Sequence, residues 1–153
     1  MPIEIIPHLW LGDYKDAKHL LPCTSIVVNC TPNIPFFGEQ TTNIRIPVID
    51  LDDSIEQETM LKHWTSTDLF KDMLNHIMQD RDVLVHCQMG RQRSAATVAA
   101  FLMTTGMPMD AAIAFIKTKK RDAFFPEVNF KSALTQFSRM INMIKLGKRD
   151  TKK

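Results

Sequence analysis

The 153-residue sequence has few cysteines and almost no net charge, and each shortage argues against a class of protein. Its three cysteines are an odd number at irregular spacing, which fits neither a disulfide framework nor a zinc site. A reducing, intracellular compartment fits best, and we expect a cytoplasmic location, with the nucleus as the alternative. The formal net charge of +2 is too small to predict binding to nucleic acid or to a membrane.

Long hydrophobic runs are also missing. No apolar stretch approaches the roughly 20 residues that span a bilayer, and we expect no signal peptide at the start of the chain. Hydrophobic residues make up 44% of the sequence and charged residues 24%, as is typical of a globular protein with a core. We expect one domain over residues 1–145, followed by a basic, disordered tail over residues 146–153.

The hydrophobic pattern predicts alternating strands and helices. Apolar runs predict two strands around a proline turn in residues 3–12, and further strands at 25–29, 43–48 and 83–85. Helices are predicted over residues 14–21, most of 56–78, 95–103 and 109–120, and from residue 130 onward. One apolar stripe along the 56–78 helix is expected to consist of Phe70, Met73, Leu74, Ile77 and Met78.

The chemically informative stretch lies between the predicted strand at 83–85 and the predicted helix at 95–103. A cysteine, Cys87, is followed six residues later by an arginine, Arg93. In a strand–loop–helix unit the loop N–H groups and the positive end of the helix dipole converge on one point. The stretch therefore predicts an anion site.

The residue types of this loop suit a phosphate group. A nearby cation and a helix N-terminus favour the thiolate form of a cysteine, so we expect Cys87 to be a nucleophile at neutral pH. Arg93 offers a planar fork for two phosphate oxygens, and Gly90 permits a tight turn. Ser94 can donate a hydrogen bond to the sulfur. The residues expected to bind the phosphate are Gln88, Met89, Gly90, Arg91, Gln92 and Arg93.

Two residues of the loop have a simpler interpretation. Cys87 could be a small buried hydrophobic residue, but that leaves the nearby Gly90 and Arg93 unexplained. For His86 the simpler interpretation is the better one, and we expect this side chain to brace the loop by hydrogen bonds.

The sequence His-Cys-x5-Arg-Ser, from His86 to Ser94, resembles the active-site loop of the protein tyrosine phosphatase superfamily. Ile-Pro-x-Leu-x-Leu-Gly, Val-Asn-x-Thr-Pro-Asn and Ile-Pro-Val-x-Asp precede it, in the order found in dual-specificity phosphatases, above all in MAP-kinase phosphatase catalytic domains. The resemblance runs from about Ile3 to about Ile144. It implies an α/β fold with a central mixed, largely parallel sheet flanked by helices.

The resemblance also implies an activity: hydrolysis of phosphotyrosine and phosphoserine or phosphothreonine in proteins, through a cysteinyl-phosphate on Cys87. The implied partner is a phosphorylated protein, and the implied mechanism needs no metal or cofactor. The family carries its general acid at the end of the Ile-Pro-x-x-Asp motif, which is Asp50 here. Asp52 and Asp53 lie on the same loop and stay open as alternatives.

Other functions remain open beside this one. Arg91 occupies a position that also carries a basic residue in an inositide phosphatase. This favours phosphoinositides or RNA 5′ phosphates as substrates. Gln88 departs from that pattern, because such loops carry lysine there. A phosphate-binding pseudophosphatase is a further alternative, and the oligomeric state is left open.

Two more residues bear on the resemblance. Glu127 stands where the family commonly has asparagine after a proline, which puts a loop contact of that asparagine in doubt. Cys30 ends the predicted strand at 25–29, where some family members carry a cysteine that forms a protective disulfide. The resemblance thus implies a Cys30–Cys87 link, and a buried core thiol is the alternative.

Overall fold

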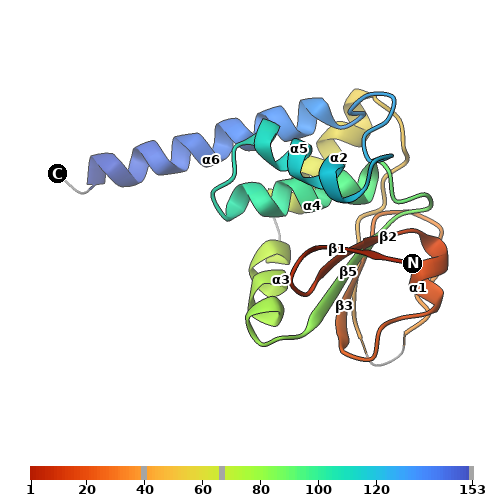
Figure 1. The fold of residues 1–153 in the computed structure, drawn as a ribbon. Coiled ribbons are helices and arrows are strands. Elements are labelled where there is room, and N and C mark those ends of the chain that lie inside the picture. The colour runs from red at the N-terminus through yellow and green to blue at the C-terminus, as the bar shows by residue number, and fades with distance from the viewer. Residues whose placement is uncertain (39–40, 66–67, 152–153) are drawn as a thin grey trace.

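The computed structural model describes residues 1–38, 41–65 and 68–151, the residues from 146 onward by their backbone only. A central sheet of five strands runs in the order β1-β2-β5-β3-β4 (Figure 1). The strands are β1 (Ile3–Ile6), β2 (Leu9–Gly12), β3 (Thr24–Asn29), β4 (Thr42–Arg45) and β5 (Asp82–His86). Only β1 and β2 pair antiparallel within the described sheet, and every other neighbouring pair is parallel. The predicted mixed, largely parallel sheet is therefore confirmed.

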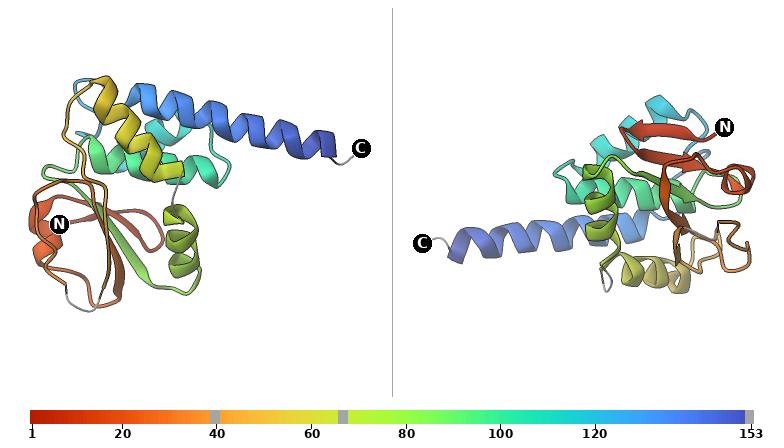
Figure 2. Two further views of the ribbon diagram at one scale, coloured as in Figure 1. Left: turned by 180° about the vertical axis from the view of Figure 1, so that it is seen from behind. Right: turned by 90° about the horizontal axis from the view of Figure 1, so that it is seen from below.

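Helices flank this sheet, as expected. They are α1 (Tyr14–Lys18), α2 (Ser54–Thr65), α3 (Leu69–Met78), α4 (Arg93–Thr104), α5 (Met109–Lys119) and α6 (Lys131–Thr151). Figures 1 and 2 show α2, α4, α5 and α6 gathered in one layer, with α1 and α3 beside the sheet and outside that layer. Helix α6 extends well past the rest of the layer. None of the described helices is both long and apolar enough to cross a membrane.

Helix α4 lies at the centre of the helical layer. Its residues from Ser94 to Met103 are all buried, and four of them are alanines. Because alanine has a small side chain, β2, β5, α5 and α6 can all approach this helix closely. The element that begins at the candidate catalytic arginine is thus fixed by packing on several sides.

Several predicted element boundaries were wrong. Helix α1 ends at Lys18 rather than at residue 21, because the backbone of His19 leaves the helical conformation. Strand β4 ends at Arg45 rather than at residue 48, just ahead of Pro47, which has no N–H for the ladder. The predicted long helix is divided into α2 and α3, and residues 66 and 67 between them lie outside the described part of the chain.

The predicted apolar stripe of α3 is only partly buried. Phe70 and Met73 belong to the core, whereas Leu74 is 41% and Met78 74% exposed. Helix α3 packs on β3 and β5, and Phe70 near its N-terminus contacts the rings of Phe101 and Phe137, so the buried part of α3 is smaller than the stripe. The expected tail over residues 146–153 falls on residues whose side chains the structure does not describe, and it stays a prediction.

Candidate active site

The loop that joins β5 to α4 leaves the middle of the sheet. Strand β5 lies between β2 and β3 and is parallel to both, so the loop emerges at the carboxyl ends of the parallel strands. In open α/β sheets ligands bind in this region. We call residues 87–92 the cysteine loop. It ends at the N-terminus of α4, whose dipole favours an anion at that point.

The Cys87 sulfur is enclosed by hydrogen-bond donors. The Gly90 N–H donates to Sγ over 3.2 Å, and the Ser94 hydroxyl oxygen lies 3.1 Å from Sγ. Hydrogen bonds to a charged acceptor are stronger than those to a neutral one, so a donor at either position can stabilise negative charge on a leaving or attacking sulfur. The residue is 2% exposed, and it lines a cleft of the described part of the chain.

That cleft has a volume of about 230 Å³, and Arg93 forms part of its wall. The Arg93 Nη1 donates to the Val48 carbonyl over 2.9 Å. Its Nε is buried and has no hydrogen-bond partner among the described residues. An unpaired buried donor costs roughly 1–3 kcal/mol, which a phosphate oxygen in the cleft would relieve. Arg93 is therefore held in place through Nη1, while its Nε lacks a hydrogen-bond acceptor among the described residues.

The three candidate acids lie in different surroundings. Asp50 lines the cleft together with Cys87 and Arg93, and its Oδ1 accepts a hydrogen bond of 2.9 Å from the Asn129 side chain. Asp53 instead accepts from the Glu56 N–H at the start of α2, over 2.8 Å. Asp52 accepts from the Gln57 side chain over 3.2 Å. Of these three carboxylates only Asp50 is among the described residues that line the cleft, which favours it as the acid.

Gln92 has a structural function that the sequence did not indicate. It is 4% exposed and also lines the cleft. Its Nε2 donates to the carbonyls of Phe125 and Glu127 at 3.2 and 2.8 Å, and its Oε1 accepts from the Asn129 N–H at 3.1 Å. The cysteine loop and residues 125–129 are thus joined by Gln92, which bonds the backbone carbonyl of Glu127 and not its side chain.

A second buried amide was also missed. Gln57, on α2, donates from Nε2 to the Asn129 carbonyl over 2.6 Å, and its Oε1 accepts from the Ala133 N–H over 2.9 Å. Asn129 is therefore held at its N–H by Gln92 and at its carbonyl by Gln57, while its side chain contacts Asp50. We expect these amides to position the candidate acid.

The remaining residues of the cysteine loop are more exposed. Met89 and Arg91 line the cleft, and Gln88 accepts the Tyr14 N–H at its carbonyl over 3.2 Å. The Arg91 Nε donates to Asp122 over 3.1 Å, and the Lys120 ammonium contacts the same carboxylate at 2.5 Å.

Asp122 is therefore shared by two cations. Its partial burial works against ionisation, but Lys120 and then Arg91 hold the pKa of Asp122 below its usual range. The positive charge of Arg91 is accordingly partly compensated.

His86 is fully buried beneath the loop. Burial lowers its pKa, although a hydrogen bond to the Cys87 carbonyl acts in the opposite direction, so the ring is neutral at pH 7. Its Nδ1 lies 3.3 Å from that carbonyl oxygen, which can only accept, so Nδ1 carries the proton. This geometry fits a bracing residue rather than an acid or base.

Cys30 is a core residue. It is fully buried, its sulfur lies 3.6 Å from the Thr97 hydroxyl, and burial raises the pKa of its thiol to about 12. Since the thiolate is the attacking species in disulfide formation, the implied Cys30–Cys87 link would form slowly at neutral pH. The link stays a hypothesis, which peptide mapping after peroxide treatment would test.

The conformation of Gly90 leads to a first prediction. Its φ is +72°, and a Cβ here would lie 2.9 Å from the Gly12 carbonyl oxygen. We expect Gly90→Ala to displace the loop and to lower kcat/KM about 10²-fold, the scale for an active-site shift of about 1 Å. Gly106→Ala is the matched control, because φ is +115° there and a Cβ would meet nothing within 4 Å. Equal activities of the two variants in a phosphatase assay would contradict this prediction.

Comparison with known proteins places the chain in a family. Residues 9–140 match the family model described as "Dual specificity phosphatase, catalytic domain". The human dual specificity protein phosphatase 7 is 30% identical, with 93% of this chain and 34% of that protein covered. The putative tyrosine phosphatase 123R of invertebrate iridescent virus 6 is 33% identical, with 92% of this chain and 94% of that protein covered. The chain spans about a third of the length of the human relatives that it matches.

Solved structures agree with this assignment at the level of the fold. A mouse putative dual specificity phosphatase complexed with zinc tungstate has a TM-score of 0.79 at 24% identity, covering 94% of this chain and 90% of that one. Human DUSP28 has a TM-score of 0.78 at 24% identity, covering 92% and 98%. Because the family match extends from β2 into α6 and includes the whole cysteine loop, this chain belongs to the dual specificity phosphatase catalytic-domain family.

Proposed function

We propose that this chain hydrolyses phosphate monoesters on tyrosine and on serine or threonine side chains of proteins. The observation that carries the proposal is the cleft itself. It combines the hydrogen-bonded Cys87 sulfur, an unsatisfied Arg93 Nε and the Asp50 carboxylate. Membership of the family supports the same reaction class.

The first chemical step forms a bond between Cys87 and phosphorus. Sγ attacks the phosphorus atom, the bond from phosphorus to the ester oxygen breaks, and Asp50 in its acid form gives a proton to that leaving oxygen. Arg93 and the loop N–H groups stabilise the charge on the other three oxygens. The dephosphorylated side chain leaves as a free hydroxyl.

The second step releases inorganic phosphate. Water attacks the phosphocysteine, and the Asp50 carboxylate takes up the proton of that water. The bond between sulfur and phosphorus breaks, and Ser94 stabilises the departing thiolate by its hydrogen bond. Neither of the two steps changes the oxidation state of sulfur or phosphorus.

The substrate range follows from the shape of the cleft. It is small and open, and its wall includes Met89 and Phe125, which is 67% exposed. With these exposed residues at its wall, we expect the cleft to admit the short side chain of phosphothreonine as well as the long one of phosphotyrosine.

Matched phosphopeptides test this proposal. We expect phosphate release from peptides that differ only in carrying phosphotyrosine or phosphothreonine, with kcat/KM measured for each in several sequence contexts. Inactivity on every phosphothreonine peptide would contradict dual specificity. A short-chain phosphoinositide and an RNA 5′ phosphate serve as comparison substrates, because Arg91 motivates that alternative. Its pairing with Asp122 leaves it less free for a second phosphate.

A further inference from the structure

A second cleft adjoins the cysteine loop at Gln88. It has a volume of about 400 Å³ and is formed by α1, by residues 33–37 and by Gln88. We call it the α1 cleft. Gln88 lines this cleft and directly follows Cys87, so the α1 cleft borders the cysteine loop one residue from the nucleophile. A substrate residue near the phosphorylated one in sequence can therefore reach it.

One wall of the α1 cleft is held by α1. The capping box of Asp13 and Asp16 fixes the first turn of the helix, and the Tyr14 N–H donates to the Gln88 carbonyl over 3.2 Å. Asp16 also pairs with the N-terminal amine at 3.1 Å. Both carboxylates of this helix are therefore already engaged in the structure.

The opposite wall is held by the buried Asn29 and the half-buried Arg45. The Asn29 side chain donates to the Ile34 carbonyl over 2.7 Å, and the Arg45 guanidinium donates to the carbonyls of Thr31 and Ile34, each over 2.8 Å. Arg45 also lies 4.8 Å from the ring centre of Phe36. The cleft is thus preformed, and Arg45 is committed to its framework rather than to a ligand.

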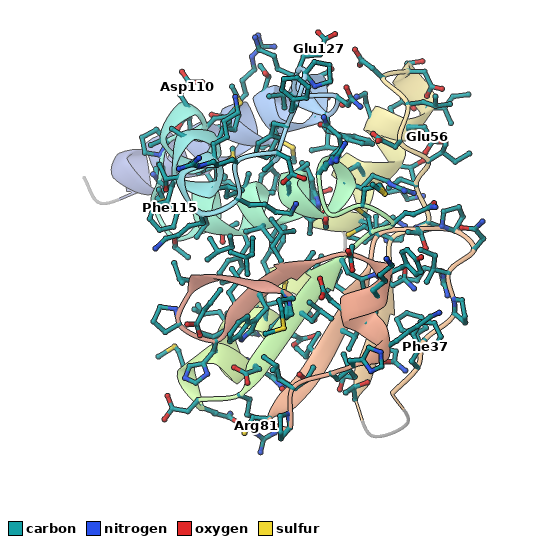
Figure 3. All side chains as sticks on the ribbon, turned by 45° about the vertical axis from the view of Figure 1, so that its right-hand side comes forward. Phe37, Glu56, Arg81, Asp110, Phe115 and Glu127 are labelled. Atoms are coloured by element: carbon teal, nitrogen blue, oxygen red, sulfur yellow. The ribbon has the colours of Figure 1, made fainter. Side chains whose placement is uncertain are left out.

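Lys18 is the cation that remains available in the α1 cleft. Its ammonium lies 5.4 Å from the ring centre of Tyr14 and 5.7 Å from that of Phe37, which Figure 3 shows beside α1. No carboxylate of the described residues lies within ion-pair distance of Lys18. An ammonium over two aromatic faces keeps donors free for an anion on its other side.

We propose that the α1 cleft is a substrate subsite in which Lys18 binds an anionic side chain close in sequence to the phosphorylated residue. The aromatic rings of Tyr14 and Phe37 contact the stem of that side chain. The anion is a carboxylate or a second phosphate, which share the charge that Lys18 recognises. This inference rests on the proposed function and names a feature of its substrates.

The test uses peptides in which a single position is varied. Glutamate, glutamine or phosphoserine is placed in turn at each of about three positions on either side of the phosphorylated residue. Three extended residues, at about 3.3–3.6 Å each, reach roughly 10 Å from the phosphorylated residue. For the wild-type chain we expect glutamate or phosphoserine at one position to raise kcat/KM about two- to fivefold over glutamine, the upper part of the range of an exposed ion pair. Whether glutamate or phosphoserine gives the increase in kcat/KM identifies the anion that the subsite binds.

Variants of α1 separate the subsite from general charge effects. We expect Lys18→Ala to remove the preference and Lys18→Glu to reverse it in favour of lysine. Lys15→Ala is the matched control, because it removes the same charge from the same helix at a residue that does not line the cleft, and it should keep the wild-type ratio. A preference that survives in Lys18→Ala, or that Lys15→Ala removes equally, overturns the proposal, as does the lack of any preferred position.

A small aryl phosphate distinguishes this failure from a failure of the proposed function. The wild-type chain should hydrolyse it, although it has no flanking residues. Hydrolysis of the aryl phosphate without any peptide preference overturns the subsite alone. No hydrolysis of either substrate overturns the phosphatase activity and the subsite that rests on it.

Discussion

Cys87→Ser is expected to abolish phosphate release while the variant still binds phosphopeptides. A hydroxyl in this position is not ionised at neutral pH and is a poor nucleophile, so the covalent step is lost. Removal of a nucleophile of this kind costs about 10⁴–10⁶-fold in rate. Phosphate binding should persist, because backbone N–H groups and Arg93 still surround the site. Phosphate release and calorimetric binding of a phosphopeptide measure the two properties separately.

Cys23→Ser is the control for this experiment. Cys23 is exposed, and its carbonyl accepts the Asp82 N–H at the start of β5, at the opposite end of that strand from the cysteine loop, so its thiol should not influence turnover. We expect wild-type activity from this variant. If Cys87→Ser were as active as Cys23→Ser, a covalent mechanism through Cys87 would be untenable.

Asp50→Asn is expected to give the second large effect, a loss of about 10²–10⁴-fold in kcat, as for removal of a general acid. An amide can accept the hydrogen bond from Asn129 but cannot protonate the leaving oxygen. The loss should be largest for phosphothreonine peptides, because an alkoxide is a poorer leaving group than a phenolate. The limb of the profile of kcat against pH that reports a protonated acid should also disappear.

The neighbouring carboxylates provide matched controls. Asp52→Asn and Asp53→Asn remove the same charge from the same loop, and asparagine can still cap α2 at residue 53. We expect both variants to lose much less activity. A large loss and an altered pH profile in Asp53→Asn, with a mild effect in Asp50→Asn, would mean that the acid had been assigned to the wrong position of the loop.

The sequence predicted the centre of the molecule well because its signals there are local. The β-branched run of β5, the cysteine loop and the alanine-rich α4 follow one another directly, and each has a strong local preference. The ends of α1 and β4 were predicted less well. The end of α1 depends on the backbone conformation of His19, and the end of β4 on the missing N–H of Pro47.

The candidate site was predicted where its residues are adjacent in sequence. The hydrogen bond from the Gln57 side chain to the Asn129 carbonyl could not be inferred. It joins positions 72 residues apart, and neither residue belongs to a motif. The choice among the three carboxylates did have an unused local signal. Asp53 and Glu56 have the spacing of a helix N-terminus, which indicates that Asp53 caps α2.

The buried amides Gln57 and Gln92 have a consequence for the thermodynamics of substrate binding. They join the loop of Asp50, residues 125–129 and the cysteine loop to one another before any substrate arrives. Ordering a mobile side chain on association costs about 0.5–1.5 kcal/mol, and this enzyme has already met that entropic cost during folding. More of the free energy of contact with a phosphopeptide is therefore available for affinity and orientation, because these three segments are already joined.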